Sequence, residues 1–79
     1  MITVEIRDAS NAGEGKAEVE IFCDGVGLDL LCKQLQHLKV GSSHVHLMTP
    51  AWAGNELAAT PVGKGTNIVN HLRITMIQK

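Results

Sequence analysis

The chain has 79 residues, of which 44% are hydrophobic and 19% are charged, and its formal net charge is −1. A chain of this length forms one small domain, residues 1–79, near the lower limit for folding without disulfides or metals. The lysines and arginines are few and scattered, which argues against nucleic acid or an anionic membrane as partner, and no apolar run approaches the ~20 residues that span a bilayer.

Two segments near the N-terminus alternate between apolar and polar residues. Residues 2–7 alternate Ile or Val with Thr, Glu and Arg, and residues 17–23 repeat this pattern. A period of two predicts strands, and the turn-forming residues 8–15 (DASNAGEG) between them predict an antiparallel hairpin. Because the chain opens on a strand pattern with no basic or apolar leader, we expect no signal peptide.

The next segment has the periodicity of a helix. Four leucines recur at spacings of three and four residues: Leu28, Leu31, Leu35 and Leu38. This spacing predicts one apolar helical face that packs on the sheet. Asp24 is the expected N-cap and Gly41 the left-handed residue after the C-terminus. Leu30 lies off the predicted face, and the pattern does not explain it.

The two cysteines indicate the compartment. Cys23 and Cys32 form neither a C-x-x-C pair nor a zinc-ribbon spacing. Small extracellular domains usually carry more disulfides than one. We therefore expect two reduced, partly buried thiols in a cytoplasmic protein, with a single Cys23–Cys32 bridge as the alternative.

A histidine-rich strand follows the helix. Residues 43–48 (SHVHLM) alternate, which places His44, His46 and Met48 on one face of a strand and Val45 and Leu47 on the other. Thr49-Pro50 ends the strand, because proline donates no backbone hydrogen bond. A long loop over residues 49–66 leads to a second alternating segment, residues 67–77, which predicts a long final strand.

These elements have the order ββαββ. We expect an α+β fold with one four-stranded mixed or antiparallel sheet and the helix packed on one face. The second and third strands would be parallel neighbours through a right-handed crossover. The other face of the sheet would then be open to solvent, and it would carry the following side chains: Thr3, Glu5, Arg7, Glu18, Glu20, Phe22, His44, His46, Met48, His71, Arg73 and Thr75.

The histidines on this open face allow three interpretations. His44, His46 and His71 could bind zinc or another transition metal, with Glu18 or Glu20 as a fourth ligand. They could equally be surface histidines that pair with carboxylates across the strands. Catalysis would use His46 or His71 as the general acid–base, with Arg73 as an anion clamp. The sequence shows neither a nucleophile elbow nor a phosphate-binding loop, so we do not expect an enzyme.

Trp52 is the one tryptophan of the chain and stands in a loop of small residues. A lone tryptophan most often folds onto a sheet edge or helix end as a lid on the core. The alternative is an exposed anchor in a protein interface, where tryptophan and arginine are enriched. Glu56 in the same loop is either a solvated carboxylate or a charge offered to a basic partner. Phe22 on the open face would suit a dimer or partner contact.

Two motif segments carry a resemblance to a known family. HVHLMTPAWAGNEL, residues 44–57, and NIVNHLRI, residues 67–74, resemble the signature of immunity protein family thirty-two of bacterial polymorphic toxin systems. The resemblance covers roughly residues 41–74, and Ala53 stands where the family has a glycine. It implies an immunity protein without a cofactor that neutralises a cognate toxin by direct contact.

The resemblance also implies which residues contact the toxin or hold the surface that does. They are the motif positions His44, His46, Trp52, Glu56, His71 and Arg73. Binding would depend on pH near 6–7 if the histidines are buried in the interface. Two further hypotheses remain open: a metal-binding protein or metal-dependent hydrolase that uses the three histidines, and a self-associating domain that forms a homodimer through the open sheet face.

Overall fold

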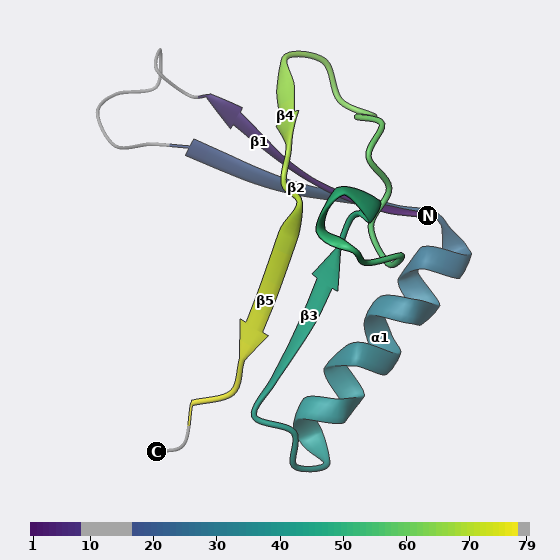
Figure 1. Ribbon diagram of the computed structural model, residues 1–79, viewed down its shortest axis with the longest axis vertical. Helices are drawn as coiled ribbons and strands as arrows, with labels where there is room; N and C mark the ends of the chain where they lie inside the picture. The colour runs from purple at the N-terminus through teal and green to yellow at the C-terminus, as the bar shows by residue number, and fades with distance from the viewer. Residues whose placement is uncertain (9–16, 78–79) are drawn as a thin grey trace.

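The computed structural model describes residues 1–8 and 17–77 (Figure 1). Its elements follow in the order β1 (Ile2–Asp8), β2 (Ala17–Cys23), α1 (Gly25–Lys39), β3 (His44–Met48), the 3-10 helix η2 (Pro50–Trp52), β4 (Thr66–Ile68) and β5 (His71–Thr75). The predicted hairpin, helix and histidine-rich strand are therefore confirmed, and the chain is a small α+β protein. Residues 9–15 of the predicted turn lie outside the described residues.

The single four-stranded sheet is the main prediction that was wrong. The strands form two antiparallel sheets, one with the order β2-β1-β4 and one with the order β3-β5. The last alternating segment supplies a strand to each sheet, because it divides between β4 and β5. β2 is consequently an edge strand of the first sheet and never becomes the parallel neighbour of β3.

The change from one sheet to the other takes place within two residues. The backbone N–H of Val69 donates to the carbonyl of Val4 in β1 (2.8 Å), and the next carbonyl, that of Asn70, accepts from the N–H of Thr49 (2.9 Å). The buried Thr49 hydroxyl also donates to the Asn70 side-chain oxygen at 2.6 Å. In Figure 1, β4 and β5 follow each other nearly in line and join the two sheets.

The core lies where the helix and the two sheets meet. Its buried apolar side chains are Ile2, Val4, Leu38, Val45, Leu47 and Leu57, with Leu30, Leu31, Val69, Leu72 and Ile74 packed around them. Leu57 belongs to the long loop, which therefore contributes to the core and is held there by backbone bonds to β3 and β1. This core is small even for a chain of 79 residues.

The helix presents a different face to the core from the predicted one. Leu38 is buried and Leu31 partly buried, but Leu28 and Leu35 are exposed. Gly27 is buried instead, and a Cβ at this position would collide with the Met1 backbone. This close approach fixes the rotation of α1, and it turns the unexplained Leu30 toward the core.

Asp24 is the helix N-cap, as expected. Its carboxylate accepts from the Gly27 N–H at 2.8 Å and from the terminal amino group of Met1 at 2.5 Å. The bond from the terminal ammonium, followed by the bond from Gly27, lowers the pKa of Asp24. The N-cap therefore ties the start of α1 to the start of β1.

Cys23 and Cys32 are unbridged, but both are exposed rather than partly buried. Cys23 ends β2, at the margin of the first sheet, and Cys32 lies on the solvent side of α1, because the core takes the face that contains Leu31 and Leu38. Among the described residues, no helix is long and apolar enough to cross a membrane.

Candidate functional site

The pairing of β3 with β5 brings the two motif segments together. His46 is opposite Arg73 and Met48 is opposite His71 in the antiparallel register. Directly opposite residues share a face of the sheet, so the three predicted histidines lie on one side of this two-stranded sheet. Residues more than twenty positions apart in the sequence thus form one surface.

The rings on this surface form a continuous row. His44 and His46 have ring centroids 4.7 Å apart in an edge-on arrangement, and His46 stacks on His71 at 4.9 Å. Trp52 adds a fourth ring, with its centroid 5.7 Å from that of His71. We call these four residues, His44, His46, His71 and Trp52, the aromatic row.

Trp52 reaches the row because of a tight turn at the end of β3. Pro50 fixes the first residue of η2, and the Ala53 N–H closes the turn on the Pro50 carbonyl at 3.0 Å. Ala53 adopts φ +64°, a left-handed conformation that suits glycine better than alanine. Trp52 remains 54% exposed, so it contacts the His71 ring but does not cover the core.

A hydrogen bond joins the two central histidines. His46 Nδ1 lies 2.6 Å from His71 Nε2, so one imidazole donates an N–H to the unprotonated nitrogen of the other. Partial burial, and then the nearby charges of His44, His71 and Arg73, lower the pKa of His46. A proton on both rings would remove the acceptor and place two like charges in contact.

The other predicted site residues have separate surroundings. Glu56 is half-buried, and its carboxylate accepts from the Met48 N–H at 3.0 Å and from the Asn55 N–H at 3.4 Å, so it holds the end of β3. Arg73 is exposed beside the row. Ser43 Oγ lies 2.9 Å from Nδ1 of His44, a contact between neighbours in sequence that limits the rotation of the ring.

The geometry gives no support to the metal hypothesis. Within residues 1–8 and 17–77, no group of three His, Cys, Asp or Glu side chains is placed so that it could hold a metal ion. His46 and His71 face each other through a hydrogen bond instead of converging on a common point. The suggested fourth ligands, Glu18 and Glu20, bind Arg7 on the other sheet.

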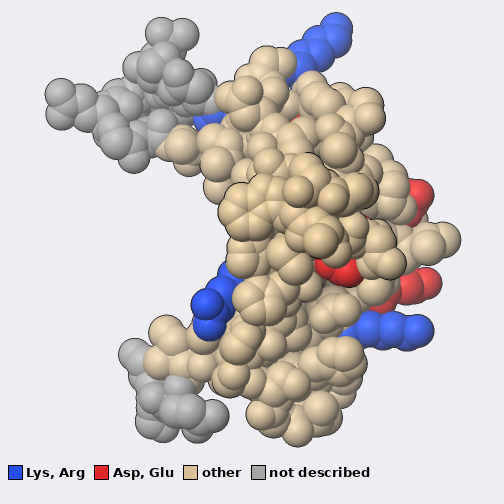
Figure 2. Space-filling view, viewed as in Figure 1, with Lys and Arg blue, Asp and Glu red and all other residues tan. Residues whose placement is uncertain are grey.

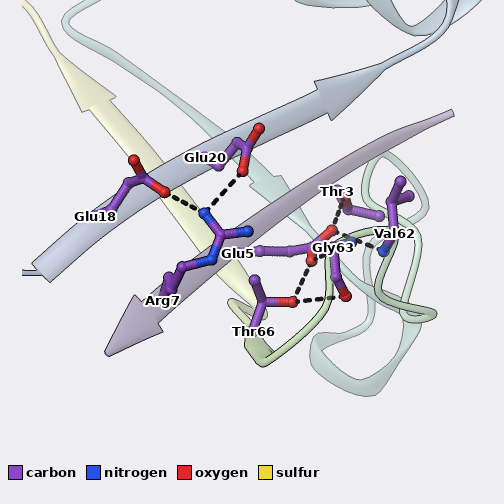
Figure 3. A network of polar contacts seen from close by, with 8 residues as sticks. All are labelled: Thr3, Glu5, Arg7, Glu18, Glu20, Val62, Gly63 and Thr66. Atoms are coloured by element: carbon purple, nitrogen blue, oxygen red, sulfur yellow. Dashed lines mark hydrogen bonds and ion pairs between the residues drawn. The ribbon is translucent and has the colours of Figure 1, made fainter. Parts of the chain in front are cut away.

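Glu5 and Thr3 are fully buried, which corrects the prediction that they lie on an open face. The Glu5 carboxylate accepts hydrogen bonds from the hydroxyls of Thr3 and Thr66 (both 2.5 Å) and from the N–H groups of Val62 (3.0 Å) and Gly63 (3.1 Å). Figure 3 shows how the loop wraps around this carboxylate. Burial alone would raise the pKa of Glu5, but the four hydrogen bonds lower it to about 2.

Arg7 occupies the same face of the hairpin. It pairs with Glu18 and, at 3.2 Å, with Glu20 across the β1–β2 ladder (Figure 3). The predicted open face is thus divided into a covered part around Glu5, an ion-pair cluster, and the aromatic row. The sequence could not show this division, because it depends on where the loop over residues 58–65 lies.

Comparisons of the chain with models of protein families, with curated proteins and with solved structures found no match. The functional inference therefore rests on the geometry of the row and on the two motif segments that form it.

Proposed function

We propose that the chain is an immunity-type protein that neutralises a cognate bacterial toxin by direct protein–protein contact. The observation that carries the proposal is the aromatic row with Trp52 half exposed at one end. Tryptophan and arginine are the side chains most enriched among binding hot spots. Trp52 and Arg73, with the histidines between them, offer such anchors on one surface.

The row suits a binding surface because it is held rigidly. The histidines are on paired strands, and their rings are in contact with one another. A surface that is ordered before binding loses little entropy when a partner docks. Glu56 accepts a hydrogen bond from the Met48 N–H and so helps to fix the end of β3, which carries part of this surface.

The two motif segments that carry the resemblance contribute to the same surface, one through β3 and the other through β5. His46 belongs to the first motif and Arg73 to the second, and they are opposite each other in the sheet. A family that preserves such a surface would need both motifs together. On the face seen in Figure 2, charged groups are dispersed among uncharged areas, so the partner is selected by local contacts and not by a strong overall field.

The proposal is tested by expressing the chain with each neighbouring reading frame and measuring growth and complex formation. One frame should arrest growth alone, and the chain should restore growth and co-purify with its product in a stoichiometric complex. Trp52→Ala should weaken this complex roughly thirty-fold or more and reduce protection, whereas Trp52→Phe should keep most of both.

Val26→Ala provides a matched control, because Val26 is 78% exposed on α1, outside the aromatic row. The proposal fails if no neighbouring product is toxic, or if Trp52→Ala and Val26→Ala bind the toxin equally well. Metal content measured on the same samples separates the metal hypothesis. If the protein carries metal but no partner, and the His46→Ala variant loses that metal, the result would support the metal-binding hypothesis instead.

A further inference from the structure

The two arginines of the chain have different surroundings. Arg7 lies on the β1–β2 hairpin and pairs with two carboxylates, those of Glu18 and Glu20. Arg73 is exposed on β5, and among the described side chains no aspartate or glutamate forms an ion pair with it. A guanidinium is charged at any physiological pH and presents several N–H donors. Arg73 is therefore available to bind an anionic group from outside the chain.

The groups nearest to Arg73 do not neutralise its charge. Arg73 is opposite His46 in the β3–β5 register, so it shares the face of the aromatic row. Burial lowers the pKa of His46 most, and the positive charges of the other two histidines and of Arg73 lower it further. The row therefore lies in a locally positive field, although the formal net charge of the chain is −1.

Glu56 is the one acidic residue of the two motif segments, and its carboxylate is bonded elsewhere. One oxygen accepts from the Met48 N–H at 3.0 Å, and the other accepts from the Asn55 N–H at 3.4 Å. These bonds hold the carboxylate against the backbone at the end of β3. Glu56 thus supplies no counter-charge to Arg73, and the charge that the row presents to a partner is positive.

We propose that the aromatic row and Arg73 bind an acidic surface of the toxin, with an aspartate or glutamate carboxylate on the Arg73 guanidinium. This inference rests on the proposed function and adds the chemistry of the toxin surface. A carboxylate matches the planar guanidinium and can accept two N–H bonds from it. Contact of the toxin with the neighbouring rings would exclude water from this pair, as at binding hot spots.

A protein carboxylate suits the row better than nucleic acid does. Nucleic acid binding relies on several lysine or arginine contacts to phosphates. Arg73 is the one lysine or arginine on strands β3 and β5. The histidines add charge only when protonated, and the hydrogen bond between His46 and His71 requires a neutral ring. One permanent charge with hydrogen-bonding rings beside it fits one or two carboxylates on a protein surface.

NMR titration of the full-length isolated chain tests this chemistry without the toxin. The probes are the peptide acetyl-Glu-Ser-Glu-amide and its uncharged counterpart acetyl-Gln-Ser-Gln-amide, at about pH 7.5 and ~20 mM salt, where surface charges are little screened. The acidic peptide should shift the resonances of the Arg73 side chain and the His46 ring, and Arg73→Gln should weaken its binding about threefold or more. The inference is overturned if the two peptides shift these resonances equally, or if neither does.

Charge reversal tests the same contact in the complex with the toxic neighbouring product. Arg73→Glu should raise the Kd about thirty-fold or more, whereas Arg73→Lys, which keeps the charge, should raise it less than about tenfold. Lys33→Glu is the matched control, because Lys33 is exposed on α1 and its reversal changes the net charge equally. The Kd of this control should change less than about threefold, since separated surface charges are screened.

The outcomes separate this inference from the proposed function. If Trp52→Ala weakens the complex and Arg73→Glu does not, the proposed function stands and the inference is overturned. A tighter complex for Arg73→Glu would indicate a basic toxin surface and overturns it as well. If no neighbouring product binds while the acidic peptide still shifts the Arg73 resonances, the proposed function fails and the carboxylate site is supported. Tighter binding of an oligouridylate than of the acidic peptide would assign the row to nucleic acid instead.

Discussion

His46 Nδ1 and His71 Nε2 lie 2.6 Å apart across the β3–β5 pair, in a contact that requires at least one neutral ring. The hydrogen bond links two strands that approach each other only in the folded chain. It also places a group that titrates near neutral pH at the centre of the proposed partner surface. The protonation of this pair should therefore affect both folding and binding.

The pKa of His46 should lie below its ordinary value of 6.5. Partial burial, and then the charges of His44, His71 and Arg73, disfavour the protonated ring. A histidine with a lowered pKa binds its proton more weakly in the folded state, so its stabilisation is complete above pH 6.5 and is lost as the pH falls through the folded pKa. Titration of the ring protons by NMR measures this pKa directly.

Removal of a neighbouring charge should move the same titration. Arg73→Gln should raise the pKa of His46, whereas Lys64→Gln should not, because Lys64 is not among the groups that act on His46. A His46 pKa of 6.5 or above in the wild type would contradict the arrangement of the row.

Glu5 should make the fold sensitive to acid. Its pKa is about 2 in the folded chain and 4.5 ordinarily, so its stabilisation is present above pH 4.5 and is lost progressively as the pH falls toward 2. Glu5→Gln should lower the melting temperature at neutral pH by roughly 10 °C, because an amide cannot accept all four hydrogen bonds. It should also flatten the acid dependence of the melting temperature between these pH values.

Glu18→Gln is the matched control for this substitution. The Glu18 side chain is 58% exposed and forms a surface ion pair, so its loss should shift the melting temperature by no more than about 2 °C. Equal shifts for the two variants, measured by circular dichroism, would show that the loop does not close on Glu5.

Two leucines on α1 distinguish the observed helix face from the predicted one. Leu38 is 9% exposed and Leu35 is 41% exposed, although the spacing of the leucines placed both on one face. Leu38→Ala should cost about 2–4 kcal/mol of unfolding free energy, and Leu35→Ala less than about 1 kcal/mol. Urea denaturation measures both, and a larger loss for Leu35→Ala would mean that the helix is rotated from its position here.

Ala53→Gly should stabilise the chain. Ala53 has φ +64°, and relief of its left-handed strain outweighs the added freedom of glycine in the unfolded chain. We expect a gain of about 0.5–1 kcal/mol in urea denaturation. Ala51→Gly is the control, because Ala51 lies inside η2 without a positive φ, and there glycine should be neutral or destabilising. A loss of stability in Ala53→Gly would contradict the turn geometry.

The local features of the fold were predictable from the sequence because they depend on neighbouring residues. The alternation of residues 2–7 and 17–23 predicted the hairpin, and Asp24 was correctly placed as N-cap. The placement of His44 and His46 on one face follows from the geometry of a strand, since side chains two residues apart point the same way. His71 was expected beside them, and the β3–β5 register brings it there.

The features that were not predictable depend on contacts between distant segments. Alternation shows which residues share a face, but it does not show which strand pairs with which, or what covers each face. Glu5 lies on the polar face of its strand, and only the approach of residues 62–66 buries it. No residue near Glu5 in the sequence indicates that its carboxylate is buried, because the residues that cover it follow more than fifty positions later.

The sequence by itself determined the first hairpin, the helix, the histidine-rich strand and the α+β class, because periodicity and capping act over a few residues. The tertiary structure decided that residues 66–75 contribute strands to two sheets, that Gly27 rather than Leu28 faces the core, and that Ile6, Val19 and Ile21 remain exposed. The described helix α1 is too short to cover every apolar surface of the two sheets. Which surfaces it buries therefore depends on how the whole chain packs.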